Sequence, residues 1–173
     1  MRFGIWVLNV FAAAFGMAAL AGLAASPWTW PTPLLVSAGV IVFCSRFAAA
    51  PNAPSPEEAG RTNRLVALWS TVEAVAILIA VIALQRVGAA RLIGPAIALI
   101  VGLHFLPLAR GLPLRAYYAT GAALIVVSVA AMLLPGGYPL PAAGAGAALV
   151  LWITSLAIAF RPAPRVESAS TPS

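Results

Sequence analysis

The sequence consists largely of six apolar runs, each 17 to 22 residues long and followed by a short segment rich in Gly, Pro or Ser. A helix needs about 20 apolar residues to cross the hydrocarbon core of a bilayer. The strict alternation of apolar and polar residues that is typical of membrane β-strands is missing from these runs. The pattern predicts an all-α, polytopic membrane helix bundle with about six transmembrane helices, over residues 3–24, 33–49, 65–85, 92–109, 116–134 and 140–160.

Charged residues make up only 8% of the 173-residue chain, whereas soluble domains carry about 25%. So few charged side chains cannot coat a water-facing surface, and lipid is therefore the expected solvent. Residues 1–160 leave no room for a sizeable domain outside the bundle. The Pro-, Ser- and Ala-rich residues 161–173 predict a disordered cytoplasmic tail after this single domain. A similar composition predicts an inner loop over residues 51–64, although Ser55-Pro56-Glu57-Glu58 is typical of a helix start, with Pro at the first helical position and acids in the first turn.

The arginines predict an orientation. The net charge is +6, and all ten basic residues are arginine. If the N-terminus is cytoplasmic, only Arg86 and Arg91 fall on the outer side, so the positive-inside rule places both termini in the cytoplasm and the chain in the plasma membrane. Because the arginines stand singly, nucleic acid is not an expected partner. Trp28, Trp30 and Tyr138 in the outer loops suit an interfacial aromatic belt, and the Tyr117-Tyr118 pair suits an inner interfacial anchor.

The N-terminus admits a second interpretation. Arg2, the apolar stretch after it and the small residues Ala21–Ala25 resemble a secretory signal with its cleavage site. The apolar stretch is longer than the core of a usual signal, and Asn9 interrupts it, which favours a retained helix. Cleavage would leave five spans and a mature N-terminus outside.

Small residues recur at four-residue spacing in three of the runs. Such stripes let helix backbones approach closely and pack by van der Waals contact. They predict close packing inside the bundle, with a homo-oligomeric contact as an alternative use. The stripes are Ala14, Ala18 and Gly22; Gly94, Ala98 and Gly102; and Gly144 with Ala148.

Glu73 and His104 are the two residues that most need a functional explanation. Glu73 lies about 12 Å of helix rise from the inner end of the third run, and the single histidine, His104, about 9 Å from the inner end of the fourth. A carboxyl at that depth must be protonated, paired or facing a wet cavity. The short loop between the two runs makes them antiparallel neighbours. A Glu73–His104 hydrogen bond is therefore geometrically reasonable, in a pair that could share or relay a proton. Whether the two side chains touch depends on the rotations of the two helices, which the sequence does not give.

Other polar residues fall at a similar depth. Asn9, Ser70 and Thr120 lie in the inner halves of their runs, so with Glu73 and His104 they predict a polar inner layer beneath a dry outer half. Pro107 follows His104 closely and removes one helical hydrogen bond. It predicts either a kink beside the histidine or the end of the helix.

Several chemistries are disfavoured. One Cys and one His form neither a disulfide framework, a zinc site nor a bis-His haem site. The sequence has no glycine-rich phosphate loop and no Gly-x-Ser-x-Gly nucleophile motif. We expect no cofactor and no metal, and an intramembrane enzyme is the least favoured function.

One segment carries a resemblance. The stretch Trp69-Ser70-Thr71-Val72-Glu73, followed by Gly102-Leu103-His104-Phe105-Leu106-Pro107-Leu108-Ala109, resembles a pattern in small bacterial integral membrane proteins. The resemblance covers about a third of the chain, and it implies a bacterial membrane protein without naming an activity.

Two functions remain open on these observations. The first is a small transporter-like or solute-binding membrane protein with a cytoplasm-facing polar pocket on Glu73 and His104, coupled to protons. The second is a non-catalytic structural or accessory membrane protein, in which the same contact only locks helices together. The bilayer is the expected partner in both, and the substrate of the first is open.

Overall fold

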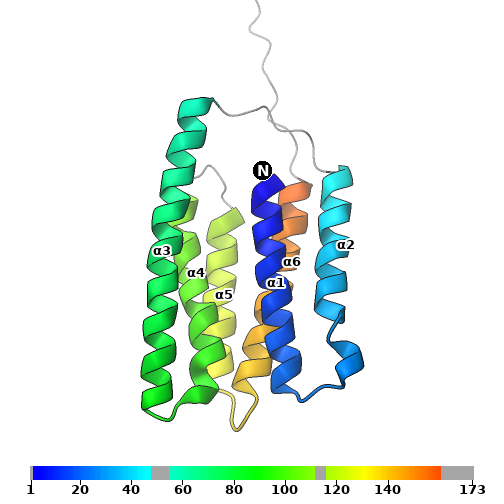
Figure 1. Ribbon diagram of the computed structural model, residues 1–173, viewed down its shortest axis with the longest axis vertical. Coiled ribbons are helices and arrows are strands. Elements are labelled where there is room, and N and C mark those ends of the chain that lie inside the picture. The colour runs from blue at the N-terminus through cyan, green and yellow to red at the C-terminus, as the bar shows by residue number, and fades with distance from the viewer. Residues whose placement is uncertain (1, 48–54, 112–115, 161–173) are drawn as a thin grey trace, which may run out of the picture.

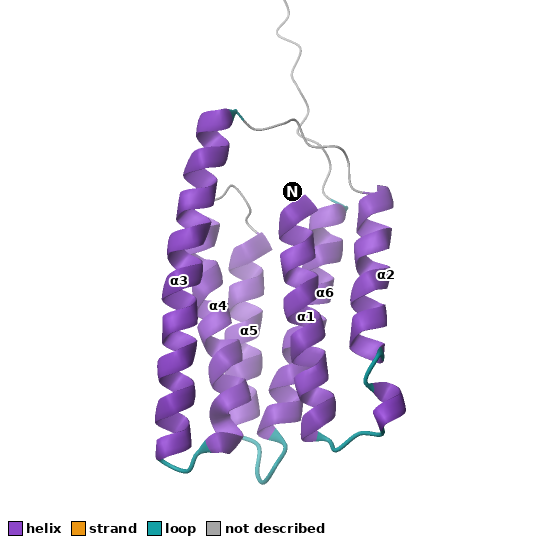
Figure 2. Cartoon of the chain, in the orientation of Figure 1, coloured by secondary structure: helices purple, strands orange, loops and turns teal. Residues whose placement is uncertain are grey.

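The computed structural model describes residues 2–47, 55–111 and 116–160 (Figure 1). All regular structure within these ranges is helical, as the sequence predicts: six α-helices and two short 3-10 helices (Figure 2). The tail predicted to be disordered, residues 161–173, lies outside the described residues.

Each predicted run corresponds to one helix. Five helical segments of the described chain are long and apolar enough to cross a bilayer, one of them made of α2 together with the 3-10 helix before it, whereas α5, with 17 residues, is shorter. The two 3-10 helices, η1 (Pro27–Thr29) and η2 (Ala90–Leu92), precede α2 and α4. The α-helices are α1 (Arg2–Gly22), α2 (Thr32–Phe47), α3 (Pro56–Arg86), α4 (Ile93–Gly111), α5 (Ala116–Met132) and α6 (Pro139–Ala159).

Helix α3 begins nine residues before the predicted span. Its start is a capping box: the Ser55 hydroxyl accepts from the Glu58 amide at 3.2 Å, and the Glu58 carboxylate accepts from the Ser55 amide at 3.1 Å. The helix start expected at Ser55 is therefore confirmed. The loop expected over residues 51–64 is wrong for residues 56–64, which continue without a break into the apolar run. At 31 residues the helix is about 46 Å long, and it projects beyond its neighbours (Figure 1).

Pro107 lies inside α4, and the helix continues past it to Gly111. The helix thus ends one turn after the proline and not at it. The missing amide of Pro107 still leaves the Leu103 carbonyl without its helical donor. The kink expected there stays a prediction.

The closest helix contacts occur at glycines. A Cβ atom added to Gly144 of α6 would lie 2.6 Å from the Phe15 carbonyl oxygen of α1. On α4 and α5, a Cβ added to Gly102 would lie 3.0 Å from the Gly121 oxygen, and one added to Gly121 would lie 2.7 Å from the Gly102 oxygen. The stripes of the fourth and sixth runs thus pack within the bundle, and a homo-oligomeric contact stays a prediction.

Helices α1, α4, α5 and α6 form the core, with fully buried residues such as Ala12, Ala98, Leu124 and Leu151 between them. Helix α2 flanks this core against α1 and α6. Helix α3 lies at the opposite edge and packs extensively only against α4 among the described α-helices (Figure 1). The edge position of α3 leaves space between it and α1.

Candidate functional site

A cavity of about 630 Å³ occupies the space between α1 and α3, with α4 behind it. Its α1 residues lie between Gly4 and Phe11, and its α3 residues between Ala59 and Ile77. Both sets belong to the half of the bundle that holds the N-terminus (Figure 1). Most of the lining side chains are apolar, so the cavity is less polar than the sequence predicts.

The cavity face of α3 follows helical periodicity. Thr62, Val66, Ser70, Glu73 and Ile77 line the cavity at spacings of three or four residues, which puts them on one side of the helix. Residues between them, such as the largely exposed Leu68 and Val75, face outward. The position of Glu73 in this stripe directs its carboxyl toward the cavity and α4.

The structure brings Glu73 and His104 together, a contact that their similar depths leave open in the sequence. Nδ1 of His104 lies 3.5 Å from Oε2 of Glu73, and each side chain is only 9% exposed. The shorter contact of this ring nitrogen is with the Trp69 carbonyl oxygen, at 3.1 Å. A distance of 3.5 Å exceeds that of an ordinary hydrogen bond. The histidine–carboxyl hydrogen bond is thus replaced by a bond to the backbone of α3, with the carboxyl at ion-pair range.

The Trp69 contact fixes the tautomer of His104. A carbonyl oxygen only accepts hydrogen bonds, so Nδ1 must carry the proton and donate it. In a neutral ring the lone pair is then on Nε2, which is left as the proton-accepting nitrogen. His104 is therefore anchored through one nitrogen and able to bind a proton through the other.

The second oxygen of Glu73 is unsatisfied. Oε1 is buried and has no hydrogen-bond partner among the described residues. Leaving a buried polar atom unpaired costs about 1–3 kcal/mol, and more if the group is charged. A proton would remove this cost, and so would a water molecule or a ligand donor once the side chain turns Oε1 toward the cavity that Glu73 lines.

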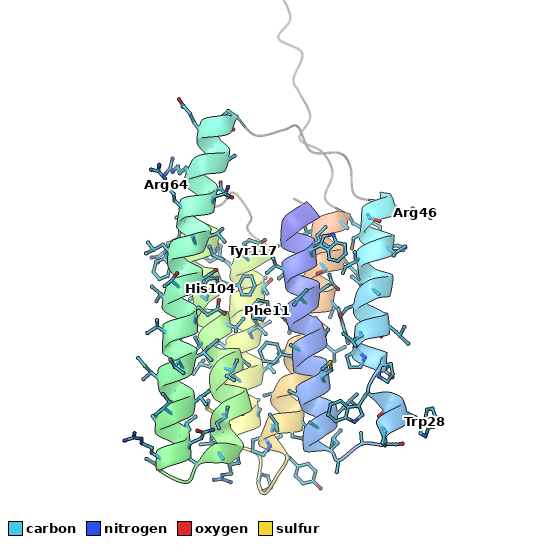
Figure 3. All side chains as sticks on the ribbon, in the orientation of Figure 1. Phe11, Trp28, Arg46, Arg64, His104 and Tyr117 are labelled. Carbon is cyan, nitrogen blue, oxygen red and sulfur yellow. The ribbon has the colours of Figure 1, made fainter. Side chains whose placement is uncertain are left out.

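Aromatic side chains form the wall around His104. The ring of Phe105 lies edge-on to His104, with centroids 6.1 Å apart, and is tilted against Tyr117 at 5.3 Å. Phe11, His104 and Tyr117 project into the region between α3 and α1 (Figure 3). They come from three helices, so the cavity depends on the packing of the bundle as a whole.

Asn9 lies away from the cavity, in the contact between α1 and α6. Its amide nitrogen donates to the Ile5 carbonyl at 2.9 Å and to the Ser155 hydroxyl at 3.0 Å. The thiol of Cys44 on α2 donates to the Ser155 carbonyl at 3.6 Å. Asn9 is fully buried and links helices instead of lining a pocket.

Thr120 also lies away from the cavity. Its hydroxyl is 2.8 Å from that of Thr154, which joins α5 to α6. One of the two hydroxyls donates to the other, and the accepting hydroxyl donates its own proton to the carbonyl four residues earlier in its helix. Ser70, by contrast, lines the cavity. Of the five residues predicted to form one polar layer, the structure gathers Glu73, His104 and Ser70 and directs the other two elsewhere.

Three polar residues of the cavity lining were missed by reasoning from the sequence. Thr62 and Asn63 fell in the expected loop, and Tyr117 was interpreted as an interfacial anchor. The capping box at Ser55 carried the missing signal, because a helix beginning there extends the stripe of Glu73 and Ser70 back to these positions. Among the described residues, no group of three or more His, Cys, Asp or Glu side chains could hold a metal ion.

Comparison with protein-family models, with curated proteins and with solved structures finds no match to this chain. The resemblance of the His104 segment to small bacterial membrane proteins therefore stays a prediction. Function has to be argued from the geometry of the cavity.

Proposed function

We propose that this chain is a small integral membrane protein of the transporter-like or solute-binding type, which binds its solute in the cavity between α1 and α3 and exchanges a proton at Glu73 and His104. The observation that carries the proposal is the buried, unpartnered Oε1 of Glu73 in a cavity of about 630 Å³. Cavities of this size hold small molecules in proteins, with a few polar groups that fix the orientation.

The proposed exchange follows from the cost of an unpaired charge. In the empty cavity Glu73 holds a proton, because an isolated carboxylate inside a membrane protein is costly. A ligand that brings a donor to Oε1 stabilises the ionised form instead. The released proton passes to water or to Nε2 of His104, whose other nitrogen is held by the Trp69 carbonyl. Ligand and proton thus compete for one carboxyl group.

We propose that the bundle crosses the plasma membrane six times, with both termini and the cavity toward the cytoplasm. Outward-facing residues of α3 support the lipid environment, since Leu68, Leu78 and Ile79 are about 60% exposed. Helix α5 is about 25 Å long, close to the thickness of the hydrocarbon core.

The placement of the arginines supports the orientation. Of the described arginine side chains, two lie at the end away from the N-terminus, Arg86 and Arg91, and four at the N-terminal end: Arg46, Arg61, Arg64 and Arg110.

Cysteine labelling tests this orientation. In a Cys44→Ala background, Thr29→Cys places a thiol in η1 and Gly60→Cys places one in the projecting part of α3, and both positions are exposed. A membrane-impermeant maleimide added to intact cells is expected to label Thr29→Cys only, and to label both variants after permeabilisation. Labelling of Gly60→Cys in intact cells would contradict the proposed orientation.

A hydrophobic carbodiimide tests the protonated carboxyl. N,N′-dicyclohexylcarbodiimide takes the proton of a carboxylic acid on one nitrogen, its central carbon bonds the carboxyl oxygen, and the adduct rearranges to a stable N-acylurea. We expect one adduct on the Glu73 peptide by mass spectrometry, with a yield that falls as the pH is raised, because ionised carboxylates react poorly. The exposed acids Glu57 and Glu58 should remain unmodified.

Two variants complete this test. Glu73→Gln is expected to abolish the adduct, whereas Glu57→Gln, an exposed carboxyl on the same helix, should leave it unchanged. Failure of the reagent to modify Glu73 at any pH between 5 and 9 would overturn the proposed proton exchange.

One observation favours the second candidate, a structural protein. The hydrogen bond from His104 to the Trp69 carbonyl joins α4 to α3, and α3 has no other extensive helix contact among the described residues. In that case the Glu73–His104 contact serves to hold α3 in place. The two candidates differ in what Glu73→Gln does to stability.

A further inference from the structure

We infer that the solute is an amphipathic amine: a mainly apolar molecule with one ammonium group that docks on Glu73. The inference rests on the proposed function and names its substrate class. Three properties of the cavity lead to it. The lining is mainly apolar, Glu73 is the single acidic group among the described lining residues, and none of these residues is an arginine that could pair with an anion.

The apolar body of the ligand is indicated by the helices opposite α3. Helix α1 contributes Ile5, Leu8 and Phe11 to the cavity, and α4 contributes Val101 and Leu108. None of the described lining residues of α1 or α6 is titratable. Burying apolar ligand surface against such side chains is favourable, at roughly 25 cal/mol per Å². A sugar or another polyhydroxylated solute would leave most of its hydroxyl groups without partners there.

The ammonium head is indicated by Glu73. Its side chain is more than nine-tenths buried and its Oε1 accepts no hydrogen bond from the described residues. A carboxylate only accepts hydrogen bonds, so the ligand must donate, and an ammonium donor forms the stronger, charge-assisted bond. The hydroxyl of Ser70, one turn earlier on the same face of α3, lines the cavity as a second acceptor.

The remaining titratable groups exclude other charge types. Among the described residues that line the cavity these groups are Glu73 on α3, His104 on α4 and Tyr117 on α5, without any arginine. Nδ1 of His104 already donates to the Trp69 carbonyl. The cationic partner of an anionic ligand could only be a His104 imidazolium, and the Glu73 carboxylate at 3.5 Å already matches that single charge. An anionic ligand, or the phosphate of a zwitterionic lipid head, would therefore add a buried negative charge beside Glu73, which is costly.

The test uses three probes that share one apolar body and differ only in the head group. These are 1-pyrenemethylamine, 1-pyrenemethanol and 1-pyrenecarboxylate, titrated against the full-length protein in phosphatidylcholine nanodiscs and followed by fluorescence anisotropy. Empty nanodiscs correct for partitioning into lipid. We expect saturable binding of the amine only, weakened roughly tenfold or more by Glu73→Gln and unchanged by Glu57→Gln.

A second variant, Ala74→Phe, tests the cavity without changing the carboxyl group of Glu73. Ala74 lines the cavity and is exposed, so Ala74→Phe fills space without disturbing the buried core. It should weaken amine binding while dicyclohexylcarbodiimide still labels Glu73.

Adding phosphatidylethanolamine to the nanodiscs should leave amine binding unchanged. Competition by this lipid would overturn the free amine as the solute in favour of an amino-lipid head.

Equal binding of the three probes, or amine binding that Glu73→Gln leaves intact, would overturn the inference. If dicyclohexylcarbodiimide still modifies Glu73 in such a case, the proposed proton exchange stands and only the substrate class is wrong. If the reagent fails as well, both are wrong.

Discussion

Replacing Gly144 with leucine is expected to destabilise the bundle by about 3 kcal/mol or more, because the substitution forces apart its most extensively packed pair of helices. A Cβ atom at this position would lie 2.6 Å from the Phe15 carbonyl oxygen and 2.9 Å from the Ala19 amide nitrogen. Both atoms belong to the backbone of α1, so no change of side-chain rotamer can relieve the overlap. Unfolding in mixed detergent and SDS micelles, followed by tryptophan fluorescence, measures the loss.

Gly39→Leu is the matched control. A Cβ atom at Gly39, in the middle of α2, would meet nothing within 4 Å. The same increase in side-chain size should therefore cost nothing there, and removal of a glycine from a helix interior should even stabilise the protein by about 0.5–1 kcal/mol. Equal stability of the two leucine variants would show that α1 and α6 do not pack as described.

The helices could be predicted from the sequence because their signals are local. Apolar runs of span length gave all six positions to within a few residues at most ends. The large exception is the start of α3, where polar residues 56–64 were interpreted as a loop. Those residues are helical because the capping box at Ser55 satisfies the first amides and the helix then continues into the apolar run that packs on α4. Tertiary packing of the later turns thus overrides the weak helix preference of the first ones.

For the site residues, only the depth of each residue along its helix could be predicted. Counting residues from the helix ends places Asn9, Glu73, His104 and Thr120 at similar heights, which made a contact between Glu73 and His104 possible without deciding it. The rotation of each helix is not encoded in such a count. Asn9 turns toward Ser155 on α6, and Thr120 turns toward Thr154, which is also on α6. Rotation is determined by which small residues allow close approach, as at Gly144, and this depends on the partner helix.

The cavity itself could not be predicted, since it arises from a contact that is not made. Helix α3 packs along α4 and leaves a space beside α1. The missing contact gives Glu73 the unpartnered oxygen that the proposed function requires. The same geometry leaves α3 dependent on a few bonds to α4, which is what the structural alternative requires.

Glu73→Gln separates these two alternatives, and it is expected to change stability by no more than about 1 kcal/mol while abolishing carbodiimide labelling and amine binding. Glutamine keeps the size of the side chain and a carbonyl oxygen, and it replaces a protonated carboxyl in the empty cavity at little cost. If the contact with His104 at 3.5 Å is instead a buried ion pair that locks α3 to α4, removal of one charge leaves the other unpaired. Stability should then fall by about 3–5 kcal/mol. SDS unfolding of Glu73→Gln beside Glu57→Gln distinguishes these values. A large loss for Glu73→Gln alone would favour the structural protein, because a carboxyl that is neutral in the empty cavity has no charge to lose.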